Sequence, residues 1–334
     1  MKRHGYLFEE ITLFANLLSA AHRALRGHQK NLAGARLVFH LEPELLALQA
    51  ELRDGTYQPR PYRVFEIYEP KRRMICAADL RDRVVHHALC HVIGPIFERS
   101  MIADSFACRV GKGAHAAVAR AQHFARRHRY YLQCDVSQYF ASIDHAVLKA
   151  LLRRKLKDAR ALSLLDQIID FPLPIATQPE VGLPIGNLTS QHFANLYLSE
   201  LDHFVKERLR MKGYLRYMDD FVVFGADKAS LRAVHAAAQE FLAENLRLQL
   251  KERATVLAPV SQGLSLLGFR VFPQLVRLKG EKWRRLQHRI RAREAAFGKG
   301  ALTEADLSRS VGSMLGHVVH ADTLRARQQF FYSS

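Results

Sequence analysis

Long hydrophobic runs are missing from this chain of 334 residues, and no stretch is apolar and long enough to span a membrane. The first residues, Met1-Lys2-Arg3-His4-Gly5, also lack the apolar run and the small-residue cleavage site of a secretory signal. The sequence contains no repeat, low-complexity tract or long linker. These absences predict a cytoplasmic protein.

Cysteine is scarce, and no two cysteines form a Cys-x-x-Cys pair. Isolated cysteines of this kind are typical of small buried hydrophobic residues in a reducing compartment. The four are Cys76, Cys90, Cys108 and Cys134.

Acidic residues are outnumbered, because 32 Asp and Glu face 50 Lys and Arg and leave a formal charge of +18. Such a charge favours a polyanionic partner, and nucleic acid is the natural candidate. Hydrophobic residues make up 49% of the chain, so it can bury a substantial core. Its length allows one large multi-lobed unit or two domains.

Two adjacent carboxylates stand out in the motif Tyr217-Met218-Asp219-Asp220, which lies between two apolar runs. Two β-strands around a tight turn would present both acids together at the tip. Carboxylates held that close repel one another, and a divalent cation, here magnesium, relieves the repulsion. The alternative is an ordinary solvated turn, in which Asp is common.

A further acid, Asp135, ends a predicted strand that begins at Tyr130, and the aromatic Phe140 follows five positions later. Carboxylates from separate strand ends can hold two metal ions about 4 Å apart, the arrangement that promotes in-line phosphoryl transfer. This is the chemistry of nucleotide addition. Taken alone, Asp135 is better explained as a strand-terminal residue that caps the next turn.

Apolar spacing and turn residues predict several elements along the chain. Thr189 or Ser190 is expected to cap the helix that follows it, and Thr303-Glu304-Ala305-Asp306 to form a capping box for the final helix. We expect helices over 6–26, 41–52, 81–97, 114–125 and 231–242, a strand over 246–250 and a short hairpin over 263–272.

Three motifs follow one another in an order that resembles the motif series of reverse transcriptases. They are Asp135 with Phe140, then Gly182-Leu183-Pro184-Ile185-Gly186-Asn187-Leu188-Thr189-Ser190-Gln191, and then Tyr217-Met218-Asp219-Asp220. That superfamily includes group II intron-like enzymes. Within it, the segment from Ile185 to Gln191 is similar to the corresponding segment in the reverse transcriptases of diversity-generating retroelements. The resemblance extends over about 57–272. It implies an α+β right-hand polymerase fold, with an N-terminal helical extension over 1–56, fingers and palm over 57–272 and a basic helical thumb over 273–334.

The same resemblance implies an RNA-directed DNA polymerase, a nucleotidyltransferase that uses two Mg²⁺ ions. Asp135, Asp219 and Asp220 would be the catalytic metal ligands, with Val136 beside them. Lys71, Arg73, Phe140, Ile185 and Gln191 would bind the nucleotide, with Phe140 excluding a ribose 2′-hydroxyl. Contacts to nucleic acid are expected from Arg109, Lys112, Tyr217, Met218, Gly268, Lys282, Arg284, Arg285 and Arg289. Several of these are also explained as solvated loops or helix faces.

Ile185 stands where many relatives carry Gln, whose amide can hydrogen-bond near the incoming nucleotide and the template. An apolar side chain removes that constraint, so the resemblance implies copying that is error-prone at template adenines. It further implies a template-repeat RNA copied into cDNA that diversifies a target gene, deoxynucleoside triphosphates as substrates, a bacterial or phage origin and a small basic oligomeric accessory variability protein as partner. Ala254 occupies the position of a lysine that donates a proton to pyrophosphate in related polymerases, which leaves that role without an assigned residue.

Other interpretations share the same acids. A retron, group II intron-like or phage-defence reverse transcriptase fits the motifs, and a non-catalytic RNA-binding scaffold would fit the charge. Intact acids at all three positions favour an enzyme over a scaffold.

Overall fold

Contacts between residues divide the chain into two compact units. The structure is a computed structural model that describes residues 3–28, 32–68, 72–176 and 178–332. Unit 1 comprises the chain up to Ala103, Asp135–Phe204 and Ala237–Lys251, and unit 2 comprises Asp104–Cys134, Val205–Ala236 and the chain from Glu252 onward. The predicted division at 57 and 273 remains a prediction.

The expected helix over 6–26 is wrong in detail, because it forms as α1 (Leu7–Ile11) and α2 (Phe14–Ala24). Leu13 breaks it with an extended backbone, φ −62° and ψ 130°. The Thr12 hydroxyl donates to the Phe8 carbonyl at the end of α1. The spacing of apolar residues correctly predicts the buried face that α1 and α2 share, but it does not predict the break between them.

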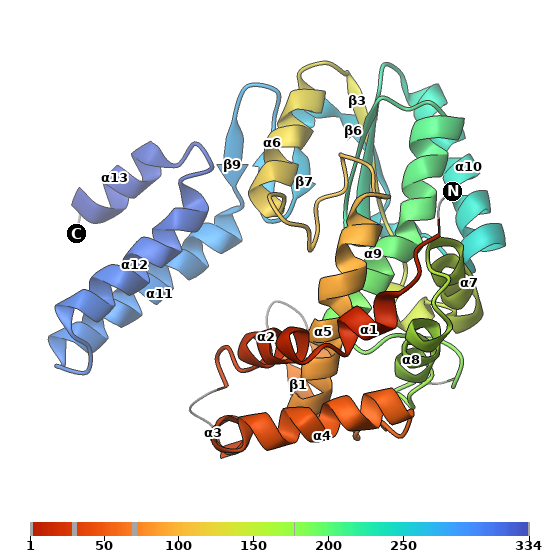
Figure 1. Cartoon of the computed structure of the whole chain (residues 1–334). Coiled ribbons are helices and arrows are strands. Elements are labelled where there is room, and N and C mark those ends of the chain that lie inside the picture. Colours follow the sequence, from red (N-terminus) through yellow and green to blue (C-terminus); the bar gives the residue numbers. More distant parts are fainter. Residues whose placement is uncertain (1–2, 29–31, 69–71, 177, 333–334) are drawn as a thin grey trace. The chain divides into compact units, whose positions relative to one another are not determined.

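Helix α5 (Leu80–Glu98) is the central helix of unit 1 and packs against α2 and α9 (Leu188–His203) (Figure 1). Its apolar residues are almost all buried, as the spacing over 81–97 predicts. Helix α4 (Leu41–Asp54) ends at Gly55, whose φ of 74° supplies the left-handed helix end that glycine tolerates best. Helix α3 (Leu32–Phe39) precedes α4.

The rest of unit 1 contains a hairpin and further helices. Strand β1 (Arg63–Ile67) pairs antiparallel with β2 (Arg73–Ala77). Helices α7 (His145–Lys155) and α8 (Ala159–Ile169) pack on each other, each with an aspartate at its N-cap that accepts a main-chain hydrogen bond. A short 3₁₀ turn, η1 (Tyr139–Ser142), precedes α7.

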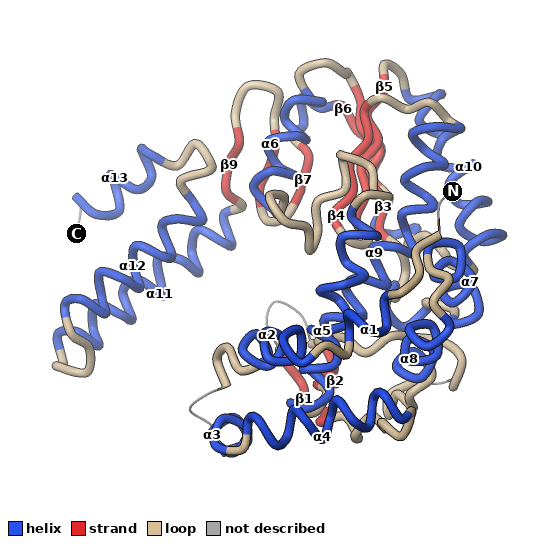
Figure 2. The backbone as a smooth tube through the Cα atoms, viewed as in Figure 1, coloured by secondary structure: helices blue, strands red, loops and turns tan. Residues whose placement is uncertain are grey.

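The main sheet has the strand order β4-β5-β3-β6. Its strands are drawn in red in Figure 2. Its strands are β3 (Tyr130–Asp135), β4 (Gly213–Tyr217), β5 (Asp220–Gly225) and β6 (Val256–Pro259). Near-continuous apolar runs such as 221–224 are fully buried, which is typical of strands covered on both faces. Helix α6 (Ala114–Ala125), which matches the predicted bounds, packs against β4.

A second sheet in unit 2 contains β7 (Leu264–Leu266), β8 (Phe269–Val271) and β9 (Val276–Leu278), in that order. It shares one apolar core with α6 and the main sheet, in which Phe124 and Phe224 lie 5.5 Å apart between ring centroids. The hairpin predicted over 263–272 is therefore confirmed.

Three helices end unit 2: α11 (Gly280–Gly298), α12 (Glu304–Val318) and α13 (Leu324–Tyr332). The Thr303 hydroxyl accepts from the Asp306 amide, as the capping box requires. It caps α12, however, and α13 follows, so the prediction that this is the final helix is wrong. A small core that includes Leu286, Ile290, Val318 and Phe330 joins the three.

Residues 246–250 do not form the predicted strand within the described residues. Helix α10 (Lys228–Leu246) extends further than 231–242, and Arg247 then takes φ 51°, a left-handed value that interrupts extended backbone. The alternation survives as a single antiparallel bridge between Val136 and Leu250. Among the described residues, every helix is too short or too polar to span a bilayer.

Cysteine burial follows the prediction at three of the four positions. Cys76, Cys90 and Cys134 are buried, and Cys108 is exposed. Cys108 lies in the loop before α6 with φ 54°, and the prediction that its side chain is buried is wrong.

Candidate active site

The two adjacent acids lie on a tight β-hairpin. Tyr217 pairs with Asp220 across β4 and β5, so Met218 and Asp219 form a two-residue turn. Met218 has φ 59°, the sign that the first central position of primed hairpin turns requires. Both aspartates are half-buried. The hairpin therefore places both aspartates at its tip, as the sequence pattern predicts.

Arg216 is a residue of this site that sequence reasoning missed. Its side chain is 0% exposed, and its Nη1 donates to the Met218 carbonyl oxygen at 2.9 Å. Its main chain exchanges hydrogen bonds with residues 104–106, which fixes β4 from the other edge. The available clue was a single cation in an otherwise apolar strand, because a fully buried arginine requires a specific partner.

The third predicted acid, Asp135, is the last residue of β3, the strand that lies beside β5 in the sheet. The main-chain carbonyl of Asp135 accepts from the Lys251 amide at 2.8 Å, and the Ser137 amide donates to the Gln249 carbonyl at 2.8 Å. Val136, between them, is 1% exposed. The strand end is thus held on both sides, and the Asp135 side chain is half-buried.

The donor set of these acids fits magnesium, which takes hard oxygen ligands such as carboxylates. Asp219 and Asp220 supply such oxygens from one turn, and Asp135 supplies them from the end of a strand in the same sheet. In the residues that the structure describes, no group of three or more His, Cys, Asp or Glu side chains is arranged to hold a metal ion. The fit therefore rests on ligand chemistry and on the hairpin.

Two of the predicted nucleotide-binding residues, Phe140 and Ile185, are tied by main-chain hydrogen bonds to or within the segment that leads into α9. The Phe140 carbonyl accepts from the Leu183 amide at 2.7 Å, and the Ile185 carbonyl accepts from the Cys76 amide at 3.1 Å. Gly186 has φ 116°, and a Cβ there would come within 2.9 Å of Ile75. The segment is therefore fixed against β2, whose first residue is Arg73. Lys71 lies outside the described residues.

Asn187 occupies the N-cap position of α9, so the prediction that Thr189 or Ser190 caps this helix is wrong. Both of those residues lie within the helix and are buried. The Asn187 side-chain oxygen accepts from the Ala78 amide at 3.1 Å and ties the start of α9 to the end of β2. Gln191 lies in the first turn of α9 and is half-buried.

Two predicted nucleic-acid contacts, Arg109 and Lys112, lie on a loop attached to the acidic hairpin within unit 2. The Phe106 amide donates to the Arg216 carbonyl at 3.0 Å, and the Gly113 amide donates back to the Phe106 carbonyl at 3.0 Å. Arg109 donates to the Ser105 carbonyl. The loop that carries these cations is therefore joined to the strand that leads to Asp219.

Gly268 and Lys282, both predicted to contact nucleic acid, touch each other. The turn of the β7–β8 hairpin has φ 50° at Leu267 and 86° at Gly268. Lys282 donates to the Leu267 carbonyl at 2.9 Å, and its amino group lies 5.6 Å from the Phe269 ring centroid. Burial, with Lys279 nearby, lowers the pKa of Lys282. This lysine supports the turn, whereas Arg284, Arg285 and Arg289 are exposed on α11.

The family model described as "Reverse transcriptase (RNA-dependent DNA polymerase)" matches residues 68–271. Protein YkfC of Escherichia coli (strain K12) is 28% identical over 289 residues, which are 73% of this chain and 74% of YkfC. The group II intron-encoded protein LtrA of Lactococcus lactis subsp. cremoris is 28% identical over 177 residues, which are 51% of this chain and 29% of LtrA. The chain thus spans under a third of LtrA.

Among solved structures, telomerase from Candida albicans in complex with a fragment of telomeric RNA superposes with a TM-score of 0.50 at 12% identity. The match covers 83% of this chain and 55% of the telomerase chain. Apo telomerase from Candida tropicalis also gives 0.50, at 10% identity, over 75% of this chain and 57% of the other. The predicted α+β right-hand polymerase fold is confirmed.

Proposed function

The chain belongs to the reverse transcriptase family, and from that premise we propose that it copies RNA into DNA at a centre formed by Asp135, Asp219 and Asp220. A primer 3′-hydroxyl would attack the α-phosphate of a deoxynucleoside triphosphate. One P–O bond forms to the primer as its hydroxyl releases a proton to solvent, and the bond to pyrophosphate breaks. The observation that carries the proposal is the hairpin that holds Asp219 and Asp220 together, on a strand beside the one that ends at Asp135.

Asp135, Asp219, Asp220 and the Val136 carbonyl would hold two Mg²⁺ ions. When bound, these ions supply electrostatic stabilisation of the charge that develops on the transferred phosphoryl group. Arg216 would fix the turn that presents two of the carboxylates, because its guanidinium is bonded to the turn itself.

The unit 1 residues would bind the incoming nucleotide. Arg73, with Lys71, would hold its phosphates, and Phe140 would lie against the sugar and exclude a 2′-hydroxyl. Support for this grouping comes from the hydrogen bonds that join the main chains of Phe140 and Ile185 to one segment and to β2. Gln191 follows on the first turn of α9.

The primer and template would be held by Tyr217, Met218, Gly268 and the cations of unit 2. Arg284, Arg285 and Arg289 are exposed on one helix, the pattern expected for contacts to a duplex backbone. Arg109 and Lys112 belong to the loop anchored on β4.

We further propose that the enzyme belongs to a diversity-generating retroelement. The supporting residues are Ile185 and the string Ile-Gly-Asn-Leu-Thr-Ser-Gln that ends at Gln191. The enzyme would copy a template-repeat RNA into cDNA with errors at template adenines, and this cDNA would be used in mutagenic retrohoming. It would act with a small basic oligomeric accessory protein. A template-repeat and variable-repeat pair beside the gene would support this assignment.

The similarity to LtrA favours a group II intron-like reverse transcriptase as the second candidate. Both candidates share the polymerase centre and differ in the RNA that they copy. A gene embedded in an intron, without paired repeats, would favour the second candidate.

Primer extension on an RNA template tests the polymerase proposal. We expect Asp219→Asn to abolish extension while the protein stays folded, because one carboxylate of the centre is lost. Asp227→Asn is the matched control, since Asp227 is exposed just after β5 and bonds only locally to Ser230 in the hydrogen bonds described. Equal extension by the wild type and Asp219→Asn would overturn the proposal.

A further inference from the structure

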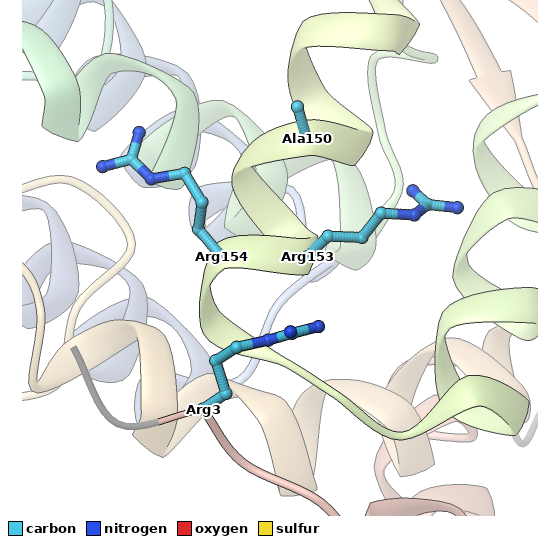
Figure 3. A pocket seen from close by; sticks show the side chains of 4 residues that line it. All are labelled: Arg3, Ala150, Arg153 and Arg154. Carbon is cyan, nitrogen blue, oxygen red and sulfur yellow. The ribbon is translucent and has the colours of Figure 1, made fainter.

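Three arginines from distant parts of the sequence line one open hollow on unit 1, of about 620 Å³. Arg153 and Arg154 extend to opposite sides of the last turn of α7, and Arg3 lies below them (Figure 3). Ala150, one turn earlier, also lines the hollow and presents only a methyl group.

Arg3 is brought to this place by main-chain pairing. The His4 amide donates to the Lys155 carbonyl at 2.9 Å, and the Lys157 amide donates to the His4 carbonyl at 2.7 Å, which forms a parallel bridge between His4 and Leu156. The Arg3 side chain then donates from Nε and Nη2 to the Leu156 carbonyl, at 3.3 and 3.1 Å. An arginine more than 150 residues away in the chain is thus fixed beside the end of α7.

The other two guanidinium groups are also held in place. Arg153 forms an ion pair with Asp166 of α8, and Arg154 forms one with Glu200 of α9 at 2.8 Å. These tethers reduce the side-chain entropy that binding would otherwise cost. Three guanidinium groups against two carboxylates leave a local positive charge, and each planar guanidinium carries five donors suited to phosphate.

Cations in the last turn of α7 have a simpler explanation, because they interact favourably with the negative end of a helix dipole. That effect accounts for Arg153 and Arg154. It does not account for Arg3, which a separate strand-like segment carries to the same hollow.

We propose that this hollow binds the phosphate backbone of RNA through residues other than those predicted for the polymerase centre. The choice of RNA rests on the proposed function, which supplies an RNA template as substrate. The predicted contacts to primer and template, Arg109 and Lys282 among them, belong to unit 2, whereas the hollow belongs entirely to unit 1. Phosphates of the RNA backbone would accept hydrogen bonds from the donors of these guanidinium groups.

The test measures RNA binding by the full chain in an Asp219→Asn background, so that binding is read independently of copying. The altered protein carries Arg153→Gln and Arg154→Gln, and the matched control carries Arg36→Gln and Arg160→Gln. Each double variant removes two exposed positive charges from unit 1. Replacing Arg160 also removes an ion pair, which Arg160 forms with Glu9. Circular dichroism and thermal unfolding confirm that each protein is folded.

We expect the Arg153/Arg154 double to bind a primer–template with a long single-stranded RNA extension several-fold more weakly than the control. The slope of log K against log salt should fall by about 1.4, because each lost contact to a single strand contributes about 0.7. Affinity for the same short duplex without the extension should stay unchanged. Lysine at both positions keeps the charge and should restore most of the slope.

Three results would overturn the inference. They are a slope equal to that of the control, an equal loss of affinity for the short duplex, or an effect confined to a DNA extension of the same length. The inference would be supported if the Arg153→Gln/Arg154→Gln protein loses RNA binding in the Asp219→Asn background, while the same double variant with Asp219 intact copies short templates normally. If the Asp219 enzyme copies nothing, the polymerase proposal fails while the binding result still stands.

Discussion

The buried guanidinium of Arg216 donates a hydrogen bond to the Met218 carbonyl, with Nη1 and O 2.9 Å apart. The arginine therefore braces the turn whose next residue is Asp219. Because Asp219 lies in this turn and Asp220 follows it, their positions depend on the side chain of Arg216 in β4.

Replacing Arg216 with Met should slow primer extension strongly and lower the free energy of unfolding by about 3 kcal/mol, since a buried charged donor is lost. Arg216→Lys keeps the charge, so its extension rate and its stability should lie between those of the wild type and Arg216→Met. The Mg²⁺ concentration for half-maximal extension should rise in both, which a purely structural loss would not produce. Unchanged Mg²⁺ dependence in folded Arg216→Met would contradict this role.

Met218 provides a second prediction, because its φ of 59° is unfavourable for a side chain branched at Cβ. We expect Met218→Val to be less stable than Met218→Ala by about 1 kcal/mol. Urea unfolding of the two proteins measures the difference. Equal stability would show that the turn adjusts its backbone.

The shape of the acidic hairpin was predictable from sequence, because a two-residue turn between apolar strands is a local property. The bounds of α6 and the Gly55 end of α4 were predictable for the same reason. Side-chain partners were not. Arg216 reads as one cation in an apolar run, and its bond to Met218 depends on how the strand packs.

Pairing over long sequence distance was equally hidden. The bridge between His4 and Leu156 brings Arg3 to α7, and nothing in either local sequence encodes that register. The strand predicted over 246–250 is wrong for a local reason. Its apolar and polar residues do alternate, but Arg247 takes a left-handed backbone conformation that interrupts the extended chain.

Gly268 and Lys282 should be energetically coupled. A Cβ on Gly268 would lie 2.0 Å from Lys282 Cε, and the φ of 86° also disfavours any side chain. Gly268→Ala should therefore lower the free energy of unfolding by about 2 kcal/mol. In Gly268→Ala with Lys282→Ala, the loss should be smaller than the sum of the single losses by about 1 kcal/mol. A strictly additive double-mutant cycle would show that the lysine moves aside without cost.

A histidine cluster in unit 2 should make stability depend on pH. His115 stacks on His320, with ring centroids 3.8 Å apart, and lies 4.9 Å from His317, whose Nε2 is 3.5 Å from the Lys282 amino group. Burial and these neighbouring cationic groups lower the pKa of His115 and His317 below the ordinary 6.5.

The unfolded chain therefore takes up protons first as the pH falls. The stability that these histidines contribute is complete above pH 6.5 and is lost as the pH drops through the range below it. His317→Gln should flatten the decline of unfolding free energy between neutral and mildly acidic pH. His288→Gln, on the exposed face of α11, is the control. Parallel curves for wild type and His317→Gln would contradict the assignment.

Ile185 should govern the accuracy of copying, because its side chain replaces an amide that would constrain the nucleotide pair. The Ile185 carbonyl accepts from the Cys76 amide, so the main chain is fixed and a substitution should change the side chain alone. We expect Ile185→Gln to reduce errors at template adenines, read by sequencing the products from a defined RNA. Ile185→Met, which stays apolar, is the matched control and should retain them. An error spectrum that is the same for Gln and Met would show that polarity at this position does not set accuracy.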